Sequence, residues 1–367
     1  MSISIIMSFL VVGCQEVVKP EQDVLEKKTL KVEIEKKIDF SDVYTPSEVC
    51  VYSASLWEAE DDNYIVNVFL GNKKVKKISY AEGPQYVYTS NTKEKEVVTI
   101  YDGGKSFFGR KENPMEAGVN YGYIEYVYFD QMFSEYKKIR NEYYERMRII
   151  SKKLDEKDKV FLKDKKEVAE YLEMLHMENY VVDEAAIFKE NKIKGCLIYL
   201  TQVINKLPIS NINFDKSSNR SGTTVYNSKL PYNTNMVQKS SMLETEFINN
   251  RLVGWWNHDV INVEKKLKQS PIVSVEEAYK KVEEQYQNYS SEVRMPILEI
   301  AELQYKIIEL NGKVYLYPVW TFCVSTEEIF KDGYTGEEHI ELEYNYFLID
   351  AITGDYFTDI DTKEFES

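Results

Sequence analysis

Residues 297–324 read ILEIAELQYKIIELNGKVYLYPVWTFCV, and this stretch decides the fold class of the chain around it. Up to Ile308, apolar side chains alternate with polar ones, which is the period of a strand with one buried face. The Asn311-Gly312 dipeptide that follows favours a tight turn. A second apolar run then continues to Val324. The stretch therefore predicts two strands joined by a short turn.

The flanking residues extend these strands into a larger unit. Ser274-Val-Glu-Glu277 is a capping-box pattern, which predicts the start of a helix. One apolar helical face follows, made of Val275, Ala278, Val282 and Tyr286. After the strands, Tyr344–Phe357 predicts a hairpin-like segment that turns at Thr353-Gly354. The pattern as a whole predicts one helix that covers one face of an antiparallel sheet.

An earlier part of the chain repeats this order of elements, with an offset of roughly one hundred residues. Its capping box is Asp164-Lys-Lys-Glu167, and a polar insertion, residues 214–235, interrupts it. The predicted strands are Val181–Phe188, Cys196–Ile204 and a hairpin, Glu246–Trp255, that turns at Asn249-Asn250. The chain is therefore expected to contain two tandem helix-plus-antiparallel-sheet units, residues 156–262 and 263–367.

Residues 29–130 are predicted to be mainly β. Leu30, Val32 and Ile34 alternate with charged residues, Tyr64–Leu70 is a short apolar run, and Val97–Tyr101 leads into Asp102-Gly103-Gly104, a hairpin signal. From about residue 130 the apolar period changes to three and four, which predicts a long connecting helix to about residue 153. The expected class is α+β, with a β-rich N-terminal domain at 29–155.

The N-terminus is an apolar run of 13 residues that ends at Cys14. A run of this length is too short to cross a bilayer, which takes roughly 20 apolar residues, but it suits the core of a signal peptide. Leu10-Val-Val-Gly-Cys14 resembles a bacterial lipobox, and this implies a diacylglyceryl anchor on the Cys14 thiol. Residues 1–14 are then a signal segment, and 15–28 a polar tether.

Two other interpretations of the N-terminus remain open. No Lys or Arg precedes the apolar run, although signal peptides begin with a positive region, so the true start codon is expected upstream. Alternatively, the run is a buried strand of a cytosolic protein.

Two motifs in the C-terminal unit carry a family resemblance. Leu316-Tyr-Pro-Val-Trp320, followed by Phe347-Leu-Ile-Asp-Ala-Ile-Thr-Gly-Asp355, resembles the PepSY type of domain and the extracytoplasmic YycH/YycI regulators of Gram-positive bacteria. With the lipobox, Tyr199–Pro208 and Asn249–Trp255 resemble uncharacterised clostridial lipoproteins. The resemblance implies a regulatory, inhibitory or folding role outside the cell. It brings no catalytic residues.

The same motifs suggest structural roles for three residues. Trp320 is expected to pack the helix against its sheet. Asp350 and Gly354 are expected to build the terminal hairpin, with Gly354 at positive φ. The first unit lacks this signature and has Ile248-Asn-Asn-Arg-Leu252 instead.

Composition excludes several classes of function. The formal net charge is −15, and such a surface repels nucleic acid and anionic lipid headgroups. The four cysteines form no Cys-x-x-Cys pair, and the three histidines are far apart, so neither a metal site nor a cofactor is predicted. We expect Cys50, Cys196 and Cys323 to be mostly free and buried.

No catalytic motif is visible, and the protein is not expected to be an enzyme. The most unusual local cluster is Trp255-Trp256, whose side chains point to opposite faces of a strand. One of the two is a weak candidate for ligand binding. The leading hypothesis is a membrane-anchored, extracytoplasmic interaction or regulatory lipoprotein that binds another surface protein. The alternatives are a small-ligand or glycan-binding lipoprotein, and a hydrolase that uses a pair of carboxylates.

Overall fold

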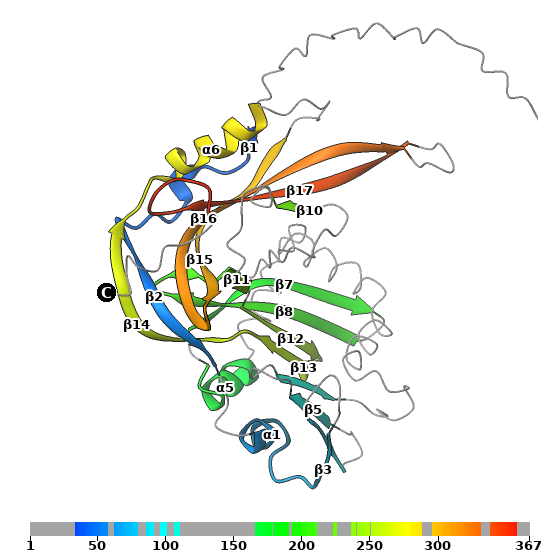
Figure 1. The fold of residues 1–367 in the computed structure, drawn as a ribbon. Coiled ribbons are helices and arrows are strands. Elements are labelled where there is room, and N and C mark those ends of the chain that lie inside the picture. The colour runs from blue at the N-terminus through cyan, green and yellow to red at the C-terminus, as the bar shows by residue number, and fades with distance from the viewer. Residues whose placement is uncertain are drawn as a thin grey trace, which may run out of the picture.

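The computed structural model describes residues 34–57, 62–79, 86–91, 96–100, 106–110, 166–177, 179–190, 193–210, 223–225, 236–239, 241–249, 251–287, 296–331 and 338–357. These residues form seventeen strands, three α-helices and one short 3-10 helix. None of the described helices has the length and apolar character needed to cross a bilayer. All the described strands belong to two large sheets (Figure 1).

Sheet A is the eight-stranded sheet. Its members are β1 (Glu35–Lys36), β2 (Glu48–Leu56), β10 (Thr223–Val225), β11 (Met236–Lys239), β14 (Ile261–Pro271), β15 (Ile297–Leu310), β16 (Lys313–Lys331) and β17 (Glu338–Asp350). The long strands β15, β16 and β17 are antiparallel neighbours. The first residues of β16 pair with β2, and the other edge of β2 pairs with β14. Helix α6 (Val275–Gln287) and η1 (Phe40–Asp42) lie on one face of the sheet.

Sheet B contains nine strands. In spatial order they are β3 (Val75–Ser79), β4 (Tyr86–Ser90), β5 (Glu96–Ile100), β6 (Ser106–Arg110), β13 (Arg251–His258), β12 (Met242–Ile248), β8 (Ile193–Ile204) and β7 (Tyr180–Glu190), with β9 (Leu207–Pro208) paired to β8. Helices α1 (Asp62–Leu70) and α5 (Lys166–Met174) contribute to the core on one face of this sheet.

The predicted α+β class, with a separate β-rich domain and two tandem PepSY-like units, is wrong. Strands dominate the described residues, and the strands expected in the N-terminal domain are divided between the sheets. Strand β2 lies between β14 and β16 in sheet A, and β6 joins β13 in sheet B. The reason is physical: a strand left with an open edge pairs with any suitable edge that the folded chain brings near it, whatever their separation in sequence. The predicted long helix, about 130–153, lies outside the described residues.

The sequence analysis placed Tyr64–Leu70 in a β-rich domain, but residues 62–70 form a helix. The run is apolar enough that periodicity alone does not separate a buried strand from a buried helix. Four of its side chains are buried in the core of sheet B: Ile65, Val66, Phe69 and Leu70. The helix ends where Gly71, at φ +59°, donates its N–H to the Asn67 carbonyl at 2.8 Å.

Several local predictions are confirmed. Asn311 and Gly312 have φ values of +53° and +75°, as a two-residue hairpin turn with both residues left-handed requires. The N–H of Glu277 donates to the Ser274 hydroxyl at 3.2 Å at the start of α6. Strands β5 and β6 form the hairpin predicted around residues 97–104, although the turn itself lies outside the described residues.

The two sheets are joined through side-chain and backbone bonds. The Gln202 side chain, at the end of β8, donates to the Ile261 carbonyl at 2.7 Å and accepts from the Ile261 N–H at 3.1 Å. The Gln202 side-chain amide therefore bonds both the N–H and the carbonyl of Ile261, the first residue of β14. Nearby, the Ser210 N–H donates to the Tyr305 carbonyl at 2.7 Å. Sheet A and sheet B thus share a polar junction as well as crossing chain segments.

Candidate functional site

The most distinctive surface feature is a two-stranded arm, which we define as residues 326–331 of β16 and 338–343 of β17. The register between these strands continues through Thr326↔Glu343 to Lys331↔Glu338. Strand β15 pairs with β16 only as far as Ser325, and β10 pairs with β17 only from Tyr344 onward. Among the described strands, therefore, the arm strands pair only with each other. Figure 1 shows this ribbon extending to the right, past β10.

The base of the arm is firmly held. Tyr344, Asn345 and Thr326 are all buried, and the Asn345 amide donates to the Thr326 hydroxyl at 3.4 Å. Next to Thr326 on β16, the Ser325 hydroxyl donates to Glu299 of β15 at 2.8 Å. A two-stranded hairpin alone is marginally stable in water, but this one continues strands that sheet A already orders. The six register pairs give an arm of about 20 Å.

The arm is acidic. Its twelve residues include five glutamates and one lysine. The register places Glu328 opposite Glu341, and like charges at directly opposed positions destabilise a strand pair. The next register position holds Ile329 and Ile340. The ribbon therefore has one position with two opposed glutamates, followed by one with two opposed isoleucines.

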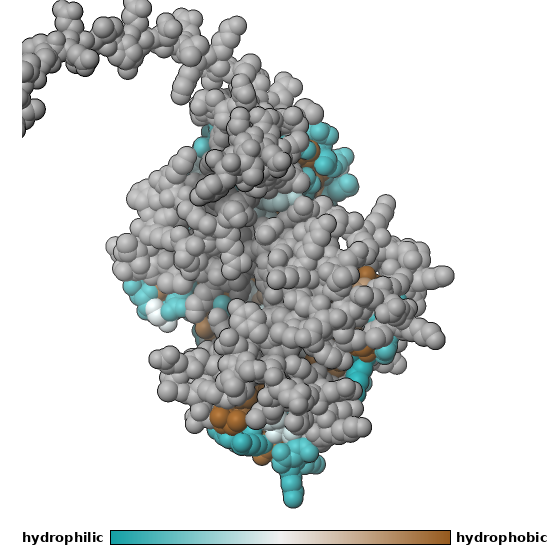
Figure 2. All heavy atoms as spheres, turned by 90° about the vertical axis from the view of Figure 1, so that its right-hand side faces the viewer, coloured by the Kyte–Doolittle hydropathy of each residue, from teal (hydrophilic) through white to brown (hydrophobic). Residues whose placement is uncertain are grey.

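Exposed hydrophobic side chains of the described residues do not gather into a docking patch. The large ones are Tyr44, Val75, Met174, Val181 and Val263, and each belongs to a different segment. On the face shown in Figure 2, the described hydrophobic residues appear only as small separate patches, with hydrophilic residues at both ends of the molecule. Scattered apolar residues need no functional explanation. Among described features, the charged arm is thus the stronger candidate for recognition.

The structure separates the two predicted tryptophans. Trp255 is 0% exposed and lies in the core of sheet B, between both of its helices. Its ring centroid is 5.7 Å from that of Phe69 in α1 and 5.9 Å from that of Tyr171 in α5. A side chain enclosed in this way offers no surface to a ligand. Trp256 alone remains a ligand-binding candidate.

Trp256 belongs to the opposite face of sheet B, which carries buried carboxylates that the sequence analysis missed. In the register, Glu244 lies between Trp256 of β13 and Tyr199 of β8. Glu244 is 3% exposed and its neighbour Glu246 is 2% exposed. The sequence Glu-Thr-Glu at 244–246 places the two glutamates on the same face of a strand, and this spacing could have pointed to them.

Gly254 makes room for one of these carboxylates. A Cβ at this position would lie 2.7 Å from Oε2 of Glu246, so the Glu246 side chain lies across the glycine. Both glutamates come from the single strand β12, whereas the two carboxylates of glycoside hydrolases flank the bond that they cleave. The arrangement favours packing of the strand over paired-carboxylate chemistry.

The three signature residues meet where α6 joins sheet A. Trp320 is fully buried beneath α6, and its indole N–H donates to the Val273 carbonyl at 3.0 Å. Asp350 accepts the N–H groups of Ile352 and Thr353 at 2.7 and 3.1 Å, and the Tyr317 hydroxyl donates to its other oxygen at 2.9 Å. These bonds hold the turn that ends β17.

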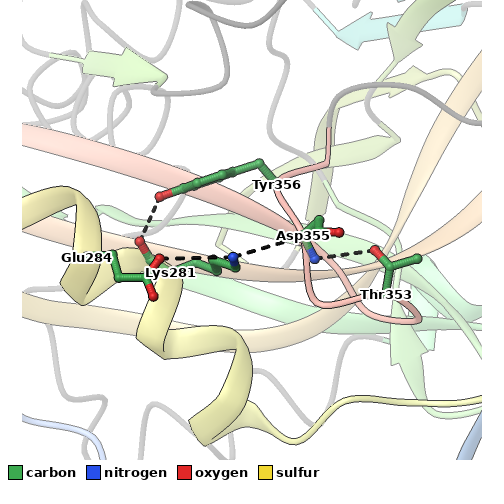
Figure 3. Close-up of polar contacts among 5 residues, drawn as sticks. All are labelled: Lys281, Glu284, Thr353, Asp355 and Tyr356. Carbon is green, nitrogen blue, oxygen red and sulfur yellow. Dashed lines mark hydrogen bonds and ion pairs between the residues drawn. The ribbon is translucent and has the colours of Figure 1, made fainter.

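Figure 3 shows how this turn is attached to the helix. The Tyr356 hydroxyl donates to the Lys281 carbonyl at 2.7 Å, and burial raises the pKa of Tyr356 to about 12. The Lys281 ammonium is 3.7 Å from Asp355 and 4.0 Å from Glu284. The Asp355 N–H donates to the Thr353 hydroxyl at 3.3 Å. The turn and α6 therefore form one structural unit, which we call the α6 clasp (residues 350–356 with α6).

Replacing Gly354 by alanine is expected to lower the free energy of unfolding by about 2 kcal/mol. Gly354 has φ +80°, and an added Cβ would meet Cγ1 of Val273 at 3.3 Å. Gly312→Ala is the matched control, because φ is +75° there and nothing lies within 4 Å of the added atom. Urea unfolding should show a loss of only about 1 kcal/mol for the control. Equal losses would contradict the contact with Val273.

The second face of sheet A contains a buried polar group. Lys306 of β15 is 0% exposed, and its burial lowers the pKa of its ammonium to about 7. On the same strand face, the Thr321 hydroxyl donates to Gln304 at 3.1 Å, and the Gln304 amide donates to Glu302 at 2.9 Å. A buried lysine with a depressed pKa is a marker of functional sites, although it also occurs in structural networks.

The remaining site predictions concern cysteines and metals. Cys50, Cys196 and Cys323 are free thiols, and the last two are buried. Within the described ranges, no three His, Cys, Asp or Glu side chains are grouped so as to hold a metal ion. Cys14, the predicted lipid attachment site, lies outside the described residues.

Comparison with solved structures shows proteins of similar fold. No protein-family model matches the chain, and no curated protein matches it. An uncharacterised protein from Eubacterium rectale ATCC 33656, known from a crystal structure, is similar over 86% of this chain and 88% of its own. The TM-score is 0.54 and the sequence identity 12%. This similarity concerns the fold alone.

Proposed function

We propose that the protein is an extracytoplasmic lipoprotein, anchored through Cys14 to the outer face of a Gram-positive membrane, with a non-catalytic interaction or regulatory function. The observation that carries the interaction part is the arm. It is an ordered ribbon whose strands pair, among the described strands, only with each other, and such edges are templates for another chain. The anchor part rests on the lipobox at Leu10–Cys14.

Residues 35 and 36 lie against sheet A and α6, close in sequence to the proposed anchor at Cys14. Strand β1 pairs in parallel with β15, beginning at Glu35↔Ile297. The Lys36 ammonium lies 4.3 Å from the ring centroid of Tyr279 and 3.3 Å from Glu283, both on α6. Residues 35 and 36, only some twenty residues after Cys14 in the sequence, thus contact sheet A and α6. A protein so tethered is kept near membrane partners, which raises their effective concentration.

Labelling with a clickable palmitate tests the anchor. The wild type is expected to incorporate label and to fractionate with membranes, because two acyl chains give durable anchoring. The Cys14→Ala variant should lose the label and appear in the soluble fraction. An unlabelled wild type that stays in the cytosol would remove the anchor from the proposal.

Shortening the arm tests the interaction. Residues 326–343 would be replaced by Asn-Gly between Ser325 and Tyr344, which are register partners, so that a two-residue turn closes the hairpin. We expect cross-linking of the protein to membrane partners to be lost, while the midpoint of urea unfolding changes little. A matched control is Glu170→Gln with Glu173→Gln, at two exposed positions of α5. If cross-links persist in the shortened protein, the arm is not the docking element.

A second candidate function, small-ligand or glycan binding, is favoured by Trp256, which is partly exposed on sheet B, whereas its register neighbours Glu244 and Tyr199 are buried. A partly exposed aromatic ring suits stacking against a sugar. A thermal-shift screen with cell-wall fragments would detect it, because a ligand that binds only the folded state raises the melting temperature. The increase should disappear in Trp256→Ala.

A further inference from the structure

We infer that the order of the arm depends on the segment that follows the proposed tether. This segment is residues 34–43, which we call the strap, and it contains β1 and η1. In the structure the strap is docked on sheet A and α6. Its release loosens the first residues of β15 and the base of the arm. The inference rests on the proposed function only in treating the arm as the docking element, because the coupling itself belongs to the fold.

The strap pairs with sheet A at the row of residues from which the arm projects. Glu35 is the register partner of Ile297, and its N–H donates to the Pro296 carbonyl at 2.8 Å. The row crosses β1, β15, β16, β17 and β10 through Glu35, Ile297, Ser325, Tyr344 and Thr223. The arm begins at the next register position. Release of β1 therefore leaves the start of β15 as an open sheet edge directly beside the base of the arm.

A side-chain link follows the same route. The register of β15 with β16 shifts around Glu299, as at a β-bulge, and bulges change the direction in which a side chain points. Oε1 of Glu299 accepts from the Ser325 hydroxyl at 2.8 Å and lies 3.6 Å from the Lys37 ammonium. One carboxylate oxygen thus connects the strap to the residue that precedes the arm. The Glu299 side chain is only 16% exposed, so solvent ions screen this pair less than a fully exposed one.

The strap is held by contacts that are individually small. The Phe40 ring is edge-on to Tyr279 of α6, with centroids 5.2 Å apart, and the Lys36 ammonium lies 4.3 Å from the centroid of the same ring. The apolar side chains of the strap are partly buried against the core of sheet A, and they are Ile34, Ile38, Phe40 and Val43. A segment with few buried contacts opens locally at a lower free energy than the sheet beneath it. The strap is therefore the element with two states, docked and released.

Hydrogen–deuterium exchange of the full protein, measured on peptides by mass spectrometry, tests the coupling. Phe40→Ala removes the ring that packs on α6 and leaves β15 and the arm unchanged. Amides of the strap and of residues 297–300 should exchange roughly ten-fold faster than in the wild type, and those of residues 325–327 and 342–345 roughly three-fold faster. Amides of β8 and β12, which belong to sheet B, should keep the wild-type rate.

Lys37→Gln tests the link through Glu299 with a milder change at an exposed position, and it also serves if Phe40→Ala does not fold. Exchange at the strap and at the base of the arm should rise about two-fold. Lys280→Gln, at an exposed position of α6, changes the charge equally and should leave both unchanged. When Ser325→Ala is combined with Lys37→Gln, the effect on the base of the arm should be smaller than the product of the single effects, because both residues act on one carboxylate.

Two results would overturn the inference. The first is a faster-exchanging strap with no change at the base of the arm, which would make the strap a cover for the core alone. The second is an equal increase in sheet B, which would mean a general loss of stability. The measurement needs neither lipid nor partner. If the coupling is absent but the shortened arm loses its cross-links, the proposed function stands and the coupling fails. If the coupling is present but the cross-links persist without the arm, the proposed docking role fails and the coupling stands.

Discussion

Replacing Trp255 by alanine is expected to lower the free energy of unfolding by about 4 kcal/mol, and Trp256→Ala by about 1 kcal/mol. The two residues are neighbours of the same type, so the difference between the two losses in stability depends on the face of the strand on which each side chain lies. Trp255 fills the space between α1, α5 and sheet B, where its removal leaves a cavity that the surrounding side chains fill only in part. Trp256 is partly exposed.

Urea unfolding followed by far-UV circular dichroism measures both losses. Trp255→Phe provides a milder change in case the alanine variant does not fold. It keeps an aromatic ring near Phe69 and Tyr171, and it removes an indole N–H that has no acceptor in the structure, among the described residues. We therefore expect a loss of about 1–2 kcal/mol. Similar losses for the two alanine variants would contradict the assignment of faces.

Replacing Lys306 by methionine is expected to stabilise the protein by about 4 kcal/mol at pH 6 and by only about 2 kcal/mol at pH 9. Burial lowers the pKa of Lys306 from 10.5 in the unfolded chain to about 7 in the folded protein. The penalty for burying this group is therefore complete below pH 7, where the ammonium is charged in both states. Above pH 7 the folded protein holds a neutral amine, and the penalty declines as the pH approaches 10.5.

The difference in the free energy of unfolding between Lys306→Met and the wild type isolates the contribution of Lys306, because all other titrating residues are present in both proteins. Lys280→Met, at an exposed position of α6, is the matched control and should show no pH-dependent difference. Urea unfolding at pH 6, 7, 8 and 9 provides the four points. A Lys306→Met variant that is less stable than the wild type at pH 6 would show that the ammonium makes stabilising interactions that outweigh its burial.

Local structure could be predicted where the deciding residues are close together in sequence. The alternation in 297–308 and the Asn311-Gly312 turn lead directly to β15 and β16, since both depend on neighbouring residues. The apolar run at 64–70 is ambiguous for the same reason, because its short-range pattern suits either a buried strand or a helix. The helix follows from its position over sheet B, where Phe69 meets Trp255, and no local signal contains that contact.

Strand partners over long distances could not be predicted. Nothing in the sequence of β2 distinguishes β14 and β16 from other amphipathic strands as neighbours, and Ser53 contacts Lys265 across 212 residues of chain. The apparent duplication therefore suggested two self-contained units, whereas the pairing of edges distributes the N-terminal strands between both sheets. The arm was missed for a related reason: it exists because β15 ends earlier than β16, and that is a property of the assembled sheet.

The division of strands between the sheets has a consequence for the order of synthesis. Strand β2 is made early, yet its neighbours β14 and β16 begin at Ile261 and Lys313, so sheet A forms only after most of the chain has been made. Sheet B likewise waits for β13, which joins the hairpins β3–β6 to the rest. Long-range pairing of this kind slows folding. A chain translocated from its N-terminus would therefore still be largely unfolded during passage through a narrow channel, and it would fold on the far side of the membrane.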